Sequence, residues 1–481
     1  MTDQTAQPGS TDNQPSAGRV SRRSLFRAAG VGAAVVGGGA LLEACSSGIK
    51  GASSSSSSSS SAAASGATGS SSSGGGSGKS ITIGWVHPLT GSLAGFGYPD
   101  NWVKQQIMAT SQFKNGIKIG GTTYQVNVNT YDTQSSVTRA GSLAKQAIQQ
   151  DNVDLLFASS TPETVNAVAT EAETLGTPLI CSNIPWESWY VNLGGNPQKP
   201  TLKPKWTVMY FLGAEHLALA FKPMWDRIGE KYGNNHKVAA AFPNDPDGNA
   251  FRAVFPAVLG PMGYTLDMST AYSDGLTNYT SMISKFKSNG DDFFTNVPLP
   301  PDFATMWTQS LQQGFKPKLA TVAKVLLFPT DAYAMGSKVY NIATDAWWVP
   351  ELPWHSSLDG QTCAEFGTAF TAAGLGQPNA NISNYTLFEI AYAALTAVNN
   401  PHDKQELMDA LLKVKLPEAV AGPIDYTSTN AKTNPAPGVA ITPPVGIQWQ
   451  KGTKYPLEAV VVDNTLQPNA KITGDLLPTF S

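Results

Sequence analysis

The feature that most constrains this chain is a regular alternation of short apolar runs with amphipathic stretches, which begins at residue 80. The apolar runs are too short for helices, and the stretches between them repeat their apolar residues at helical spacing. Strands that alternate with helices through short joins predict βαβ units and a parallel sheet covered on both faces. The predicted strands are 80–87, 123–132, 154–159 and 177–182, and the predicted helices are 100–114, 137–150 and 161–175.

The same rhythm starts again after residue 236. Strands are predicted at 237–242, 264–269, 291–297 and 318–323, with helices at 248–258, 279–288 and 303–313. Two doubly wound α/β sheets in one chain predict two lobes with a cleft between them. Ligands of such sheets bind in the crevice at the carboxyl ends of the strands, so the loops that follow the strands should hold the site.

The segment before the alternating region has the composition of an export signal followed by a tether. Paired arginines at 22–23 precede a short apolar run rich in Gly and Ala, which is typical of a signal peptide and resembles the twin-arginine type. Leu42-Glu43-Ala44-Cys45 resembles a bacterial lipobox. We therefore expect 1–44 to be a signal peptide and Cys45 to become a lipid-modified N-terminus at the outer face of the cell membrane, since acyl chains bury many CH₂ groups.

Residues 45–79 are dominated by Ser, Gly and Ala. Such a composition buries too little apolar surface to offset the entropy of ordering it, and it is typical of a flexible tether. A random coil of this length has a reach of roughly 30 Å, which would let a folded region move above a bilayer.

Charge and motif content exclude several classes of function. The whole chain has a formal net charge of −3, and residues 1–44 hold four arginines and three carboxylates, so the remainder is slightly acidic at −4. No basic stripe points to nucleic acid. The five histidines are scattered, no G-x-S-x-G elbow follows a strand, and we expect neither a metal, nor a cofactor, nor catalysis. Cys181 ends an apolar run, which favours a buried free thiol, although pairing with Cys363 stays open.

Several motifs in order resemble the branched-chain-amino-acid-type solute-binding proteins of ABC transporters. HPLTGSLAGFG follows the first strand, and Asp132 and Ser135 form a D-x-x-S pattern about forty residues later. The order and spacing of these segments carry the resemblance over most of 80–481. The other matching segments are FASSTPET (157–164), GTPLICSN (176–183), FPNDPDGNAF (242–251), SLQQGFKPK (310–318), NYTLFEIAYAAL (384–395) and AGPIDYT (421–427).

The resemblance implies a type I periplasmic-binding-protein fold with two doubly wound parallel-sheet lobes and a three-strand hinge. It implies that lobe one comprises 80–207 plus 345–420 and that lobe two comprises 208–344 plus 421–481. A small ligand would bridge the lobes and stabilise their closure, and the loaded protein, a monomer, would dock on the permease of an ABC importer.

The candidate ligand-binding residues of lobe one follow its strands. Hydroxyl groups at the start of the helix after 154–159 would join free backbone N–H groups in a site for a carboxylate, helped by the helix dipole, although they could equally be ordinary helix caps. An aromatic residue in the first loop lies where the family often covers its ligand. These candidates are Phe96, Ser159, Ser160, Thr161, Ser182 and Asn183.

The candidates of lobe two are Asp247, after its first strand, and Lys324, at the place where amino-acid binders often carry an acidic residue. A buried lysine without a partner is costly, so a Lys324 that lined the cleft would favour an acidic ligand. Among the tryptophans near the expected cleft and hinge, Trp186 and Trp347 are the preferred ligand walls.

The sequence thus predicts an extracytoplasmic binding protein that captures an amino acid, an amide or a small organic acid and delivers it to an ABC importer. Two alternatives stay open: a sensor of the same fold that feeds a receptor, and a lipid-anchored extracellular hydrolase on an α/β fold.

Overall fold

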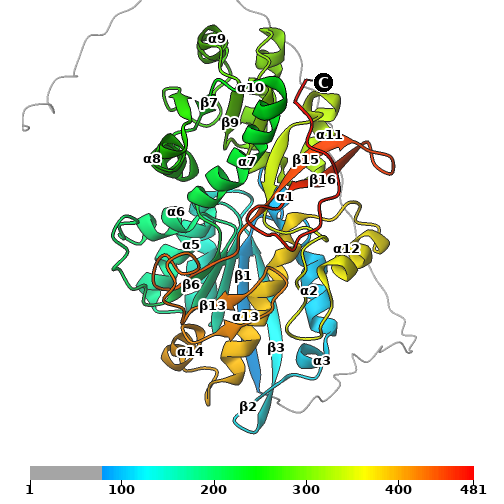
Figure 1. Cartoon of the computed structure of the whole chain (residues 1–481). Helices are drawn as coiled ribbons and strands as arrows, with labels where there is room; N and C mark the ends of the chain where they lie inside the picture. Colours follow the sequence, from blue (N-terminus) through cyan, green and yellow to red (C-terminus); the bar gives the residue numbers. More distant parts are fainter. Residues whose placement is uncertain (1–78, 481) are drawn as a thin grey trace, which may run out of the picture. The chain divides into compact units, whose positions relative to one another are not determined.

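The computed structural model describes residues 79–480, which belong to one compact unit (Figure 1). The predicted signal peptide, Cys45 and the tether up to residue 78 lie outside the described residues.

Sheet one has seven strands in the order β14-β6-β5-β4-β1-β3-β2. All neighbours run parallel except β2 and β3, which form an antiparallel pair at the edge. The strands are β1 (Ser80–His87), β2 (Ile117–Ile119), β3 (Thr122–Asp132), β4 (Leu155–Ser159), β5 (Leu179–Ser182), β6 (Thr207–Phe211) and β14 (Val439–Ile441).

Helices cover this sheet because its central strands are apolar on both faces, as β4 illustrates with five buried residues in succession. Trp85 of β1 and Phe157 of β4 make edge-to-face contacts with Phe388 of α13, with ring centroids 5.5 and 4.9 Å apart. The helices along these segments are α1 (Ala94–Gly97), α2 (Asp100–Ala109), α3 (Ser111–Lys114), α4 (Val137–Gln149), α5 (Pro162–Leu175), α6 (Trp186–Asn192), α12 (Cys363–Ala372), α13 (Tyr385–Thr396) and α14 (Lys404–Leu411).

Sheet two also has seven strands, in the order β16-β15-β11-β10-β9-β7-β8. Five of them are parallel, and β15 and β16 extend the sheet in antiparallel fashion from β11. The strands are β7 (Lys237–Ala241), β8 (Thr265–Met268), β9 (Phe293–Asn296), β10 (Leu319–Val322), β11 (Ala343–Ala346), β15 (Val445–Lys451) and β16 (Leu457–Asp463).

The helices of this second sheet are α7 (Ala214–Tyr232), α8 (Pro246–Leu259), α9 (Thr280–Asn289), α10 (Pro300–Gln312) and α11 (Pro329–Met335). In Figure 1 the red C-terminal strands β15 and β16 lie with the green elements of this sheet, far from them in sequence. A separate two-stranded ladder joins β12 (Lys415–Leu416) to β13 (Ile424–Asp425).

The chain passes between the sheets three times, after β6, after β11 and after β14. We call sheet one with its helices lobe one (79–211 and 347–441) and sheet two with its helices lobe two (212–346 and 442–480). The expected boundaries at 207 and 420 therefore need correction, because β6 ends at residue 211 and β14 pairs with β6 in the sheet of lobe one.

Candidate functional site

The N-terminus of α5 forms the lobe-one side of the site. β4 ends at Ser159 and α5 begins two residues beyond Ser160, with Pro162 in its first turn, where a missing N–H costs nothing. Thr161 is the N-cap residue, yet its side chain makes no capping bond. The hydroxyl oxygens of Ser160 and Thr161 are buried without a hydrogen-bond partner among the described residues. The two hydroxyl groups at this helix end are therefore free to meet a ligand.

The N-terminus of α8 lies on the lobe-two side. Asp245 caps the helix by accepting a hydrogen bond from the backbone N–H of Gly248 at 2.6 Å. Asp247, in the first helical turn, is only 3% exposed. Both carboxylates follow β7, so they lie at the carboxyl end of a parallel strand, where ligands of such sheets bind.

Lys324 reaches the site from a strained turn after β10. Its φ and ψ are 72° and −57°, and the N–H of Val325 donates to the carbonyl of Ala323 at 2.9 Å. These values describe a γ-turn centred on Lys324, a rare conformation for a residue with a side chain. Strain of this kind persists where the surroundings hold it and is concentrated at functional sites.

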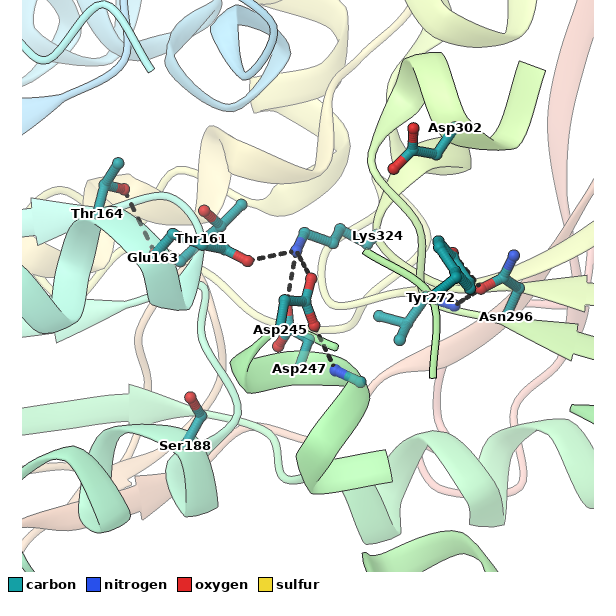
Figure 2. Close-up of polar contacts among 12 residues, drawn as sticks. Thr161, Glu163, Thr164, Ser188, Asp245, Asp247, Tyr272, Asn296, Asp302 and Lys324 are labelled. Carbon is teal, nitrogen blue, oxygen red and sulfur yellow. Dashed lines mark hydrogen bonds and ion pairs between the residues drawn. The ribbon is translucent and has the colours of Figure 1, made fainter. Parts of the chain in front are cut away.

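The ammonium group of Lys324 lies among three carboxylates from both lobes (Figure 2). Its Nζ is 2.8 Å from Asp247 Oδ2, 3.0 Å from Glu163 Oε1 and 3.4 Å from Asp245 Oδ2. Glu163 belongs to α5 of lobe one, and the other three residues belong to lobe two. The lysine therefore bridges the lobes, and its side chain is only 4% exposed.

Burial and mutual repulsion shift the titration of these carboxyl groups. Burial, opposed by Lys324 and reinforced by the neighbouring carboxylates, raises the pKa of Asp247 to about 7 and that of Asp245 to about 6. The nearby ammonium instead lowers the pKa of Glu163 against the opposing effect of burial. Asp245 and Asp247 therefore titrate near neutral pH.

A small cavity adjoins the ammonium group. It encloses about 30 Å³, room for about one water molecule. A larger ligand would enter only if the lobes moved. The lining residues are Phe96, Thr161, Pro162, Asn183, Pro185, Phe211, Leu212, Leu217, Asp247, Phe251, Val297, Ala323, Lys324, Leu327, Asp345 and Trp347.

Aromatic rings form one wall of this cavity. Trp347 stacks with Phe96 at a centroid distance of 6.4 Å and meets Phe211 edge-on at 4.9 Å. Its indole Nε1 is buried without an acceptor among the described residues. The wall thus combines apolar rings with one open donor, a combination typical of ligand pockets.

The D-x-x-S pattern positions the loop that carries Phe96. Asp132 accepts hydrogen bonds from the N–H groups of Leu89 and Thr90 at 2.9 and 3.2 Å. Ser135 Oγ accepts from the N–H of Leu93 and lies against Gly91, whose φ is 90°. A Cβ at Gly91 would lie 2.5 Å from that oxygen, so the loop requires glycine there.

The structure brings six of the ten predicted residues to the cavity: Phe96, Thr161, Asn183, Asp247, Lys324 and Trp347. Four do not line it. Ser159 Oγ accepts from Trp85 Nε1 inside lobe one, Ser160 is buried away from the cavity lining, and Ser182 donates to its neighbour Asn183. Trp186 donates to Glu215 Oε1 at the start of α7, so its expected role as a ligand wall is not supported by its place.

Lys324 lines the cavity, as the sequence analysis considered. This position no longer favours an acidic ligand, because the ammonium group already has partners in the protein. Each of the three N–H donors of the ammonium already has a carboxylate nearby. The positive charge is therefore compensated within the protein rather than left open for an acid.

Sequence reasoning missed Glu163 and Asp345. An acidic residue in the first turn of a helix is ordinary, so Glu163 gave no signal of its contact with Lys324. Asp345 lies in the buried strand β11, lines the cavity, and has its pKa raised to about 7 by burial. A carboxyl group within a buried strand was a signal that could have been followed.

Within residues 79–480, no His, Cys, Asp and Glu side chains gather in a group suited to a metal ion. In the same part of the chain, no helix has both the length and the apolar character needed to cross a bilayer. Cys181 and Cys363 are both buried free thiols, which confirms the prediction for Cys181 and excludes their pairing in this structure.

Comparison with known proteins identifies the class. The family model described as periplasmic binding protein matches residues 80–440, which is most of the chain. The chain belongs to the periplasmic binding protein family, a family of solute-binding proteins rather than of enzymes.

Solved structures agree with this assignment at the level of the fold. The leucine-binding protein LivK of Thermotoga maritima superposes with a TM-score of 0.64 at 17% identity, covering 80% of this chain and 99% of its own. LivJ of Streptococcus pneumoniae, in complex with isoleucine, gives 0.61 at 17% identity, with coverages of 80% and 100%. A solute-binding protein of an ABC transporter from R. palustris, in complex with 4-hydroxybenzoate, gives 0.63 at 16% identity, with coverages of 84% and 99%.

The fold is thus the two-lobed type I periplasmic-binding-protein fold that the sequence predicted.

Proposed function

We propose that this protein captures a small polar molecule between its two lobes, without altering it, and delivers it to an ABC importer. One observation carries the proposal: a cavity at the carboxyl ends of both sheets, with unpartnered polar atoms contributed by each lobe. Membership of a solute-binding family, whose members bind small molecules and ABC transporters, supports it.

We also propose that Cys45 anchors the protein by lipid at the outer face of the cell membrane, and that residues 46–79 act as its tether. An anchored tether would keep the loaded protein at a high local concentration near its permease. Replacing Cys45 with serine should move the protein from the membrane fraction to the medium. Retention of the Cys45→Ser variant in the membrane fraction would contradict the anchor.

A thermal-shift screen of the purified protein against a few hundred small metabolites tests the capture step. Binding to the native state raises the melting temperature by mass action. The Thr161→Val variant should bind a hit about tenfold more weakly, because an open hydroxyl at the site is lost. The control is Thr170→Val, on the same helix, where the hydroxyl donates to the backbone of Asn166 instead.

A hit that the protein converts into another compound would contradict the proposal, and so would a screen without any hit. Loss of uptake of the hit on deleting the gene tests delivery and separates an importer component from a sensor.

A further inference from the structure

The cluster around Lys324 carries more negative than positive charge. One ammonium group faces the carboxyl groups of Glu163, Asp245 and Asp247, which gives a formal charge of −2 when all three are ionised. Asp245 and Asp247 are at most 5% exposed. Excess charge in a buried place is unfavourable unless a proton or another cation compensates it.

Among residues 79–480, Lys324 is the one cation within ion-pair distance of these carboxylates. Arg252, on the same helix as Asp247, directs its guanidinium to the carbonyl oxygens of Phe242 and Ser269. The other titratable groups around the cluster are mostly acidic. Asp274, Asp302 and Tyr272 of lobe two interact electrostatically with members of the cluster, and Tyr279 adjoins Asp274 and Asp302. Asp345 lines the same cavity as Lys324, and Glu187 of α6 lines another cavity with Asp245 and adjoins Glu215 of α7, which contacts His216.

Two carboxylate oxygens in this cluster have no partner. Glu163 Oε2 and Asp247 Oδ1 are buried and have no hydrogen bond of good geometry among the described residues; the Thr161 hydroxyl lies near enough to Glu163 only to help lower its pKa. Their carboxylates already meet Lys324 through the other oxygen. What these oxygens lack is a donor, and an ionised acceptor is satisfied best by a charged donor.

We infer that the ligand is a small organic cation with a flat apolar body, whose charged N–H group meets the open oxygens of Asp247 and Glu163 while its body packs on Phe96, Phe211 and Trp347. The inference rests on the proposed function and narrows it. Aromatic rings beside a cation add a further attraction. An acid would instead have to draw Lys324 away from three carboxylates.

Binding of such a ligand is linked to protons. Without it, the raised pKa values of Asp245 and Asp247, about 6 and about 7, leave the cluster partly protonated at neutral pH. A bound cation lowers these pKa values and expels protons. The affinity for a cation should therefore rise with pH between about 5 and about 8, and that for an anion should fall.

Three probes of matched shape test the charge: benzamidinium, benzamide and benzoate, which are positive, neutral and negative at neutral pH. Calorimetric titration should rank benzamidinium first, with at least about fivefold tighter binding at about pH 8 than at about pH 5. Preference for benzoate, tighter cation binding at low pH, or no binding of benzamidinium would overturn the inference.

The metabolite screen separates the two proposals. An anionic hit whose affinity depends on Thr161 would leave the binding function standing and refute the cation. A screen without hits would refute the binding function itself.

Proton release gives a second readout. Titrations of benzamidinium in phosphate and in Tris differ in heat by the number of protons released multiplied by the difference between the ionisation enthalpies of the two buffers. The wild type should release roughly half a proton at about pH 7, most of it from Asp247, and Asp247→Asn should release fewer. The control is Asp291→Asn, which removes another carboxyl group with a raised pKa, of about 6, at the opposite end of β9 from the cavity. Equal release from wild type and Asp247→Asn would contradict the inference.

Discussion

Two buried carboxyl groups of this protein, those of Asp100 and Asp247, differ in how many of their oxygens have a partner. Asp100, inside lobe one, has a partner for each oxygen: His87 Nδ1 at 2.6 Å and Asn384 Nδ2 at 2.8 Å. Asp247, between the lobes, meets Lys324 with one oxygen and leaves the other without a partner. Both are almost completely buried.

The difference separates a structural carboxyl group from a binding one. The partners of Asp100 all belong to lobe one, so both of its oxygens have a hydrogen-bond partner whatever the lobes do. The cluster of Asp247 draws on both lobes and is left incomplete. A buried polar group without a hydrogen-bond partner lowers the stability of the folded state. A binding site can retain such a group because the ligand supplies the missing partner.

The largest expected effect is on the free energy of unfolding when the structural carboxyl group, that of Asp100, is removed. Asp100→Ala would leave the buried His87 Nδ1 without its carboxylate and would remove one of the two acceptors of Asn384 Nδ2, so it should lower the free energy of unfolding by about 3 kcal/mol. Asp247→Ala should cost clearly less, because it also relieves repulsion among the carboxylates. Urea unfolding of both variants measures this. Equal losses would break the comparison.

Lys324→Met should have the next largest effect, with a marked pH dependence. Without the ammonium, the pKa values of Asp245 and Asp247, already raised by burial, rise further, and the lowered pKa of Glu163 rises as well. The folded variant then holds more protons than the unfolded chain, so its stability falls as pH rises. We expect a loss of about 2 kcal/mol at about pH 8 and a smaller one at about pH 5. A loss that is greater at the lower pH would contradict the assigned electrostatics.

A smaller effect is expected in the wild type itself. The folded pKa of Asp247, about 7, lies above that of an unfolded aspartate, so this group favours the folded state at low pH and loses that contribution as pH rises to about 7. In the Asp247→Asn variant, the free energy of unfolding should change between about pH 5 and about pH 8 by about 1 kcal/mol less than it does in the wild type. Denaturant midpoints across this range measure it, and an unchanged slope would speak against the raised pKa.

The smallest effect concerns the two cysteines. Because Cys181 and Cys363 are both free and buried, dithiothreitol should leave the melting temperature unchanged. A fall on reduction would indicate a disulfide that the structure does not contain.

Much of the fold could be predicted from sequence, since local periodicity decides each element. The helices α5, α8 and α10 and the strands beside them lie within a few residues of their predicted bounds. The places of Thr161, Asp247 and Lys324 at the cavity also followed, because strand ends converge at one edge of a parallel sheet.

What could not be predicted depends on contacts between distant residues. The pairing of Lys324 with Glu163 joins residues 161 positions apart and lies across the two lobes. Trp186 was expected at the ligand because tryptophans gather near clefts, but its N–H is taken by Glu215. Neither local periodicity nor composition records which partner a polar side chain finds.

A crystal structure of the protein with the best hit from the metabolite screen tests the central claim most directly. The account predicts the intact compound between the N-termini of α5 and α8, in contact with Asp247 and beside Trp347. Density for the compound elsewhere, for example only in the outer cavity of about 490 Å³ that Glu187 and Asn249 help to line, or a compound chemically changed in the crystal, would contradict it.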